Sequence, residues 1–393
     1  MSRPLVRFLS HGAERSGPPI YLLRLLRYWK MHPAEFDTEL VIARPGALAT
    51  QFAELAPTSV ARLDPGSIEM TLSSLTRVAH AQALSPHILG LATRARVRGN
   101  PWRSAHRQPE ITIVNGATVA TVALLRQLQS SSTVLTIAHE LSTGWFGNLT
   151  QKDREFLLEK TTRFLAVSQA VKQFLLAELG VSEHQITVIH PAIDVGEFAD
   201  PGYTRLAQDF LHVGGSGMTD WRKAPEIWLR IAAELRDMMP QENLRFTWLG
   251  GENPNSAAFW PLEHEMNQLS IAEQVRFTGQ IDSPAAAMSQ FDLFISTARE
   301  DAYPLACAEA VSLGVPVIGF ESGGLSEMAR ESGCALVVPY PEHSQITRTA
   351  AEWLRNPALR NQLGKRGTEF GRKHLDVSVI APAVGDWILG RAA

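Results

Sequence analysis

The sequence predicts an α/β protein with two domains, each built on a doubly wound parallel sheet, that face each other across a cleft. Its 393 residues exceed what one ordinary hydrophobic core accommodates. Short apolar runs alternate with amphipathic stretches along nearly the whole chain, which is typical of buried parallel strands joined by helices. Residues 191–205 interrupt this alternation with two prolines, two glycines and no periodicity, so the joint between the domains is expected there.

The predicted elements follow the chain in two series of similar length. In the first, strands are expected at LVRFLS (5–10), TELVIA (38–43), EITIVN (110–115), TVLTIAH (133–139), RFLAVS (163–168) and ITVIH (186–190), with helices at 18–29, 117–128 and 169–179. In the second, strands are expected at DFLHVGG (209–215), LRFTWLGG (244–251), QVRFTG (274–279), FDLFIST (291–297), VPVIGF (315–320) and ALVVPY (335–340). The predicted domains are 1–198 and 199–375, followed by a C-terminal helix at 376–393 that packs back on the first domain.

Composition narrows the class of protein. A hydrophobic content of 45% and a charged content of 20% describe a globular protein, and the net charge of -3 argues against nucleic acid as the main partner. The 2 cysteines form no C-x-x-C pair, which suits a reducing compartment. The apolar runs are too short for a signal peptide or a membrane span, so a cytoplasmic protein is expected.

A basic cluster surrounds Trp102. Its members are Arg94, Arg96, Arg98, Arg103 and Arg107. Such a cluster is either a solvated loop or a patch for an anionic acceptor or a membrane surface, and both interpretations stay open.

In each series a glycine-containing loop follows the first strand, at the end of the sheet where ligands of doubly wound sheets bind. The loop in SHGAERSGPPIYLL (10–23) leads into a helix whose N-terminus could face a polar acceptor or a phosphate, although an ordinary turn explains it equally well. In HVGGSGMTDWRKAPEIWLRIA (212–232), Asp220 replaces the third glycine of a dinucleotide fingerprint. Arg222 and Lys223 are either common surface cations or a pair that holds a diphosphate.

Two further stretches place polar residues at strand ends. His139 follows the strand in TIAHELSTGW directly, as a polar cap or as a catalytic or sugar-binding group. In TAREDAYPLACAEAVSLGVPVIGF (297–320), Glu309 lies in the middle of an apolar helix that Pro304 opens. A buried carboxylate needs a partner, which is either a structural arginine or ligand hydroxyls such as a ribose diol.

Taken together, these stretches resemble the family 4 glycosyltransferases, whose fold is GT-B with two Rossmann-like domains. Four segments carry the resemblance in the family's order: 10–26, 163–194, 215–235 and 297–309. The last looks like the family's two-acid signature, Glu, seven residues, Glu. Asp301 stands in its first place, and Ala224 replaces the usual glycine of the donor-phosphate segment.

The resemblance implies a role for each matching residue on the donor side. Arg222 and Lys223 would neutralise the leaving diphosphate, Asp301 would bind hydroxyls of the donor sugar, and Glu309 would bind the ribose. Gly215 would belong to the loop that approaches the donor. Because Asp301 is one methylene shorter than glutamate, it could change the choice of donor sugar while keeping the charge.

The remaining implied roles concern the phosphates and the acceptor. Backbone N–H groups of Leu305 and Ala306 would meet phosphate or sugar, since a helix begins there. His139 would sit beside the reacting sugar, as a further catalytic residue, and Ser16 and Gly17 would mark the acceptor side.

The activity implied is a retaining, metal-independent transfer of a sugar from a UDP- or GDP-sugar to a hydroxyl acceptor. The acceptor would be a saccharide or a lipid-linked saccharide in polysaccharide, lipopolysaccharide or glycoconjugate biosynthesis, with peripheral membrane contact and no cofactor. The sequence has no Asp-x-Asp pair of the kind that holds a metal on a diphosphate. Two alternatives remain: a GT-B nucleotide-sugar epimerase and a catalytically silent GT-B binding protein.

Overall fold

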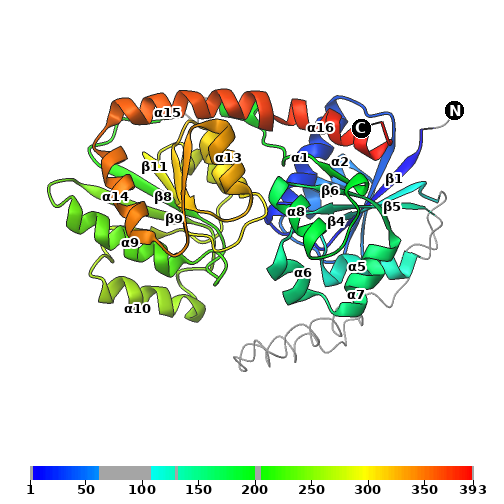
Figure 1. Cartoon of the computed structure of the whole chain (residues 1–393), viewed down its shortest axis with the longest axis horizontal. Helices are drawn as coiled ribbons and strands as arrows, with labels where there is room; N and C mark the ends of the chain where they lie inside the picture. The colour runs from blue at the N-terminus through cyan, green and yellow to red at the C-terminus, as the bar shows by residue number, and fades with distance from the viewer. Residues whose placement is uncertain (1–2, 62–107, 129–131, 200–204, 392–393) are drawn as a thin grey trace. The chain divides into compact units, whose positions relative to one another are not determined.

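The computed structural model describes residues 3–61, 108–128, 132–199 and 205–391. These form two compact units (Figure 1). The first runs to Ala192 and includes the C-terminal segment from Ile380, and the second is Ile193–Val379. The division therefore falls a few residues before the predicted boundary after residue 198.

The first unit contains a parallel sheet of seven strands in the order β3-β2-β1-β4-β5-β6-β7. The strands are β1 (Leu5–Ser10), β2 (Asp37–Ile42), β3 (Thr58–Val60), β4 (Ile111–Asn115), β5 (Thr133–Ala138), β6 (Thr161–Ala166) and β7 (Ile186–Val188). The chain moves outward from β1 in one direction through β2 and β3, and in the other through β4 to β7. The switch point, where ligands of such sheets bind, is therefore between β1 and β4.

Helices of the first unit connect these strands. They are α1 (Gly17–Met31), α2 (Ala49–Leu55), α5 (Val119–Leu128), α6 (Ser142–Asn148), α7 (Gln151–Lys160), α8 (Gln169–Ala177) and most of α16 (Val377–Ile388). Hydrogen bonds from Trp29 and Arg163 tie α16 to this unit. Trp29 Nε1 donates to Ala381 O at 3.3 Å, and Arg163 Nη1 donates to Trp387 O at 2.6 Å. Trp387 itself is fully buried.

The second unit repeats the architecture with six parallel strands in the order β10-β9-β8-β11-β12-β13. They are β8 (Leu211–Ser216), β9 (Leu244–Leu249), β10 (Val275–Phe277), β11 (Leu293–Ser296), β12 (Val317–Phe320) and β13 (Ala335–Val338). Its switch point is between β8 and β11. The loops that follow these two strands are 217–224 and 297–304.

The second unit also has helices between and after its strands. They are α9 (Pro225–Met238), α10 (Trp260–Gln268), α11 (Pro284–Met288), α12 (Leu305–Ser312), α13 (Gly324–Ser332), α14 (His343–Leu354) and α15 (Pro357–Phe370). α9 packs on α14, whereas α12 packs on α15 and α13. Since right-handed crossovers on the two sides of a switch point place their helices on opposite faces, the sheet is covered on both sides.

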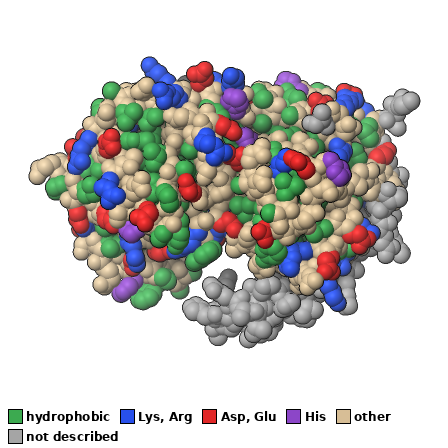
Figure 2. Space-filling model, viewed as in Figure 1, with side chains coloured by type: hydrophobic (Ala, Val, Ile, Leu, Met, Phe, Trp, Pro, Cys, Tyr) green, Lys and Arg blue, Asp and Glu red, His purple; other side chains and the backbone are tan. Residues whose placement is uncertain are grey.

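The predicted strands are all present, with ends that differ by a residue or two. β3 was not predicted, because this edge strand has only three residues, none of them buried, and no apolar run. The basic cluster around Trp102 lies outside the described residues. Across the described part, none of the helices is both long and apolar enough to cross a membrane. Acidic and basic side chains are interspersed on the face shown in Figure 2.

Candidate functional site

Three charged residues predicted from the sequence meet at the switch point of the second unit. The Lys223 ammonium donates a hydrogen bond to Asp301 Oδ2, and Arg222 Nη1 lies 3.7 Å from the same oxygen. The side chains of Lys223 and Asp301 are only 15% and 11% exposed, so this ion pair is largely shielded from water. Two cations and one carboxylate leave a net positive charge at the carboxyl end of the sheet.

Two backbone features place Lys223 there. Gly217 has a φ of 148°, and a Cβ on it would stand 2.9 Å from Lys223 Cγ, so glycine lets the lysine stem lie against the loop. Ala224 adopts a left-handed conformation, with φ 50° and ψ 55°, and is the N-cap residue of α9 ahead of Pro225. Left-handed backbone favours glycine, yet Ala224 keeps this conformation.

α12 begins beside these charges. Pro304 precedes Leu305 and Ala306, and it supplies no side-chain cap within the described structure. Glu309 is buried on this helix, 8% exposed. Burial raises the pKa of the Cys307 thiol to about 12, an effect that the nearby positive charge of Lys223 opposes. The thiol therefore stays protonated near neutral pH and is a poor nucleophile.

Gly215 has a packing role. It lies inside β8, where a Cβ would stand 2.7 Å from Trp228 Nε1 and 2.7 Å from Trp248 Cε3. The two indole rings are buried and pack edge to face, 5.5 Å between centroids. This contact explains the need for glycine, and the donor-binding role predicted for Gly215 stays a prediction.

His139 lies at the carboxyl end of β5 in the first unit, one strand from the switch point. Its Nε2 is 2.8 Å from Asn115 Oδ1. Asn115 Nδ2 donates to Pro18 O at 3.0 Å, which assigns the amide oxygen to the histidine. His139 therefore carries its proton on Nε2 when neutral. Burial, reinforced by the charge of His11, lowers its pKa to about 3.

Glu140 ties two loops of this unit together. Its Oε2 accepts hydrogen bonds from Ala117 N at 2.9 Å and from His139 N at 3.1 Å. Burial raises the pKa of Glu140 to about 7, although these N–H donors act in the opposite direction. Gly116 has a φ of 93°, and a Cβ there would be 2.7 Å from Glu140 Oε1.

Ser16 and Gly17 lie at the start of α1, in the loop after β1. Gly17 is the first helical residue, and Ser16 Oγ lies 3.4 Å from His11 Nε2. Asn115 contacts the next residue of this helix, Pro18, so one polar cluster joins the ends of β1, β4 and β5. The structure thus gathers the predicted acceptor-side residues in the first unit and the predicted donor-side residues in the second.

Two glycosyltransferase family models match this chain. One, described as Glycosyltransferase Family 4, matches residues 56–197, and the other, Glycosyl transferases group 1, matches residues 213–370. The chain belongs to the family 4 glycosyltransferases. The regions matched contain both the His139 loop and the charged loops at the switch point of the second unit.

Individual relatives of this family 4 chain are distant. It is 22% identical over 197 residues to the D-inositol 3-phosphate glycosyltransferase of Paenarthrobacter aurescens, a match that covers 48% of each protein. The chain thus spans about half the length of the curated relatives it matches.

Solved structures resemble it over nearly their full length. Anabaena Alr3699/HepE in complex with UDP and glucose has a TM-score of 0.75 at 14% identity, with 98% of this chain and 100% of that one covered. Sucrose-phosphate synthase from Thermosynechococcus elongatus has a TM-score of 0.72 at 17% identity, covering 99% of both. The predicted GT-B class, with two Rossmann-like domains, is confirmed.

Four residues of the two clusters in this family 4 chain were missed or given no role by the sequence analysis: Asn115, Glu140, Thr297 and Arg299. Each follows or ends a buried strand, at or next to a switch point. A polar residue at the carboxyl end of an apolar strand indicates a site residue. This pattern holds for Asn115 at the end of β4 as well as for His139 after β5.

Proposed function

We propose that this chain transfers a sugar from a UDP- or GDP-sugar to a hydroxyl acceptor, with retention of configuration and without a metal. The observation that carries the proposal is the ion cluster of Arg222, Lys223 and Asp301 at the switch point of the second unit. Two cations on a hydrogen-bonded loop are suited to a diphosphate, because charge-assisted hydrogen bonds to phosphate are strong.

The proposed mechanism is stabilisation of the leaving group. As the bond from the sugar to the diphosphate breaks, negative charge grows on the β-phosphate, and the two cations offset it. The N–H groups of Leu305 and Ala306, at the start of α12, act in the same sense. Removing one such contact costs about 2.7–4 kcal/mol of barrier. The β-phosphate itself accepts the proton of the acceptor hydroxyl.

Asp301 has two successive partners in this proposal. Without a donor it pairs with Lys223 and lies close to Arg222. A diphosphate would take over these cations, which leaves the carboxylate of Asp301 available to hydroxyls of the donor sugar. Glu309 would bind the ribose, since its buried position on α12 suits a hydrogen-bonded carboxylate.

The acceptor side of the proposal rests on the first unit. A pKa of about 3 keeps His139 uncharged at neutral pH, and an uncharged imidazole suits a neutral hydroxyl group. The acceptor would be a saccharide or lipid-linked saccharide, in polysaccharide, lipopolysaccharide or glycoconjugate biosynthesis in the cytoplasm. Relatives named as inositol phosphate glycosyltransferases support a polyol acceptor of this kind.

Thermal shift with UDP, GDP, ADP and their glucose conjugates tests the proposal. One nucleotide should raise the melting temperature, by an amount that grows with the logarithm of its concentration relative to its dissociation constant. Lys223→Met should abolish the shift, whereas Lys172→Met should retain it. Lys172 is the control, because its ammonium also pairs with a carboxylate, that of Glu183 at 2.8 Å, but on α8 of the first unit. If no nucleotide stabilises the wild type, or if both variants respond alike, the proposal is lost. Product analysis then separates transfer from epimerisation and from silent binding.

A further inference from the structure

Arg299, in the loop between β11 and α12, holds the backbone of the loop that carries the two cations. Its Nη1 donates a hydrogen bond to Trp221 O, and its backbone N donates to Arg222 O at 2.8 Å. The guanidinium also lies over the Trp221 ring, 5.1 Å from the centroid. One residue thus contacts two consecutive peptides of the loop that leads to Lys223.

Thr297 holds the next two peptides. Its hydroxyl lies 3.0 Å from Lys223 O and 3.0 Å from Ala224 O. Thr297 is 1% exposed, so this contact is made by a buried hydroxyl whose single hydrogen the two carbonyls share. Ala224 O also accepts a hydrogen bond from Ile227 N at 3.1 Å. With Arg299, the segment 297–299 thus contacts every carbonyl from residue 221 to residue 224, and those of Lys223 and Ala224 share one hydroxyl donor.

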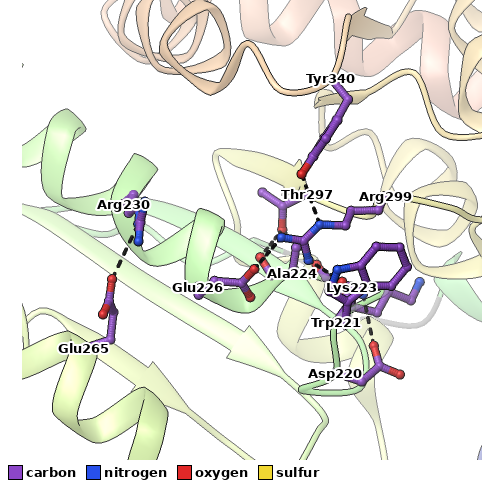
Figure 3. Close-up of polar contacts among 10 residues, drawn as sticks. All are labelled: Asp220, Trp221, Lys223, Ala224, Glu226, Arg230, Glu265, Thr297, Arg299 and Tyr340. Atoms are coloured by element: carbon purple, nitrogen blue, oxygen red, sulfur yellow. Dashed lines mark hydrogen bonds and ion pairs between the residues drawn. The ribbon is translucent and has the colours of Figure 1, made fainter. Parts of the chain in front are cut away.

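The Arg299 side chain is itself fixed on two further sides. Its Nη2 donates to Glu226 Oε1 at 2.7 Å, and its Nε donates to the Tyr340 hydroxyl at 3.2 Å. Figure 3 shows the guanidinium between these groups and the Trp221 ring. A planar fork makes such contacts in three directions, which a lysine ammonium at the end of a flexible stem does not reproduce.

Asp220 holds the same loop through its N–H groups. Asp220 Oδ1 accepts from Lys223 N at 3.0 Å, and Asp220 O accepts from Ala224 N at 3.0 Å. The loop is therefore hydrogen-bonded on both edges before any ligand arrives. Binding does not have to order it, which improves affinity without adding a contact.

We propose that Thr297 and Arg299 are positioning residues of the donor-phosphate site, which fix the backbone from which Arg222 and Lys223 extend. The inference rests on the proposed function for its ligand, a nucleoside diphosphate. The hydroxyl of Thr297 and the guanidinium of Arg299 are directed to protein partners. In this proposal they act through the position of the two cations, which bind the diphosphate, so their loss should weaken binding of the second phosphate.

Hydrogen exchange of the free protein tests this arrangement without a ligand. In the peptide that contains residues 218–226, Thr297→Val and Arg299→Lys should raise amide exchange about tenfold, as expected for the loss of one hydrogen bond. Arg230→Lys is the matched control. Arg230 lies on α9 and pairs with Glu265 at 3.5 Å (Figure 3), away from the loop. If neither variant changes exchange beyond this control, the inference is overturned.

The affinities of UMP and UDP, or of GMP and GDP if guanine is preferred, measure how much the second phosphate contributes to binding. The ratio of the two dissociation constants reports the second phosphate alone, and Thr297→Val and Arg299→Lys should reduce it about tenfold. Thr297→Ser, which loses a buried methyl group but keeps the hydroxyl, should restore the ratio. A purely structural role would instead follow stability and affect both nucleotides equally.

The two proposals fail in different ways. If the wild type binds no nucleotide, the proposed function is lost, while hydrogen exchange still decides whether Thr297 and Arg299 hold the loop. If the wild type binds UDP and Lys223→Met does not, but Arg299→Lys matches Arg230→Lys in the UMP-to-UDP ratio, only the positioning role is refuted.

Discussion

His139 and Glu140 should give the first unit opposite responses to pH that nearly cancel. The folded pKa of His139 is about 3, against an ordinary value of 6.5. Its contribution to the free energy of unfolding is therefore lost as the pH falls below 6.5. The folded pKa of Glu140 is about 7, against an ordinary value of 4.5. Here the folded state binds more protons, so stability falls as the pH rises from 4.5 to 7.

Both effects have the same size over one accessible range. On acidification from about pH 7 to about pH 5, the contribution of His139 to the free energy of unfolding should fall by about 2 kcal/mol, since each pH unit between its two pKa values is worth about 1.4 kcal/mol. The contribution of Glu140 should rise by about 2 kcal/mol over the same range. The wild type should therefore show little net change from this pair of neighbouring residues.

Single variants should reveal the pH response of each residue separately. Glu140→Gln keeps an oxygen for Ala117 N and His139 N, and its free energy of unfolding should fall by about 2 kcal/mol relative to wild type on acidification. His139→Gln keeps a donor for Asn115 Oδ1, and its free energy of unfolding should rise by about 2 kcal/mol relative to wild type.

Urea unfolding of the three proteins at both pH values measures these changes, and other titrating groups cancel in the differences. If both variants follow the wild type within about 0.5 kcal/mol, the pKa shifts assigned to this pair are wrong.

Three further predictions concern individual backbone and charge features. Ala224→Val should destabilise the second unit by about 2 kcal/mol or more in urea unfolding, because a β-branched residue is strained at φ 50°, whereas Ala224→Gly should stay within about 1 kcal/mol of wild type. Asp301→Asn should leave UDP binding equal or tighter in thermal shift, since Lys223 loses a competing carboxylate, but should reduce the extra stabilisation by UDP-glucose. An equal loss for both ligands would contradict the role of Asp301. Gly116→Ala should lower the melting temperature through strain at φ 93° and through contact with Glu140, and an unchanged value would contradict this.

The fold could be predicted because its strands are short, apolar and regularly spaced. Such runs are buried on both faces, and the non-periodic segment near residue 191 separates two similar series. The switch points follow from strand order, which periodicity does not give. Once the order is known, the loops that carry Arg222, Lys223 and Asp301 become neighbours, although 78 residues separate Lys223 from Asp301.

The rest of the site depends on backbone geometry that residue types do not reveal. The resemblance assigns Gly215 to the donor loop, which stays a prediction, and the structure adds a packing role against Trp228 and Trp248 that the sequence does not show. The sequence places Glu140 with His139 directly after a buried strand, and only its burial and two N–H donors show that it joins two loops. Arg299 lies inside the segment 297–309 that carries the resemblance, but its residue type does not reveal its partners, which are Trp221 O, the Glu226 carboxylate and the Tyr340 hydroxyl.

The two departures from the family pattern can be understood from the same segment, 297–301. Ala224 in place of glycine carries a strained left-handed backbone, which persists only where surrounding contacts determine it. Thr297 supplies such a contact at Ala224 O. Asp301 is one methylene shorter than glutamate, and the Lys223 ammonium nevertheless reaches it. The Thr297 contact that holds Ala224 also holds Lys223 O. Changing residue 224 to glycine should therefore make the site less dependent on Thr297, so the effect of Thr297→Val on loop exchange should be smaller in the Ala224→Gly background.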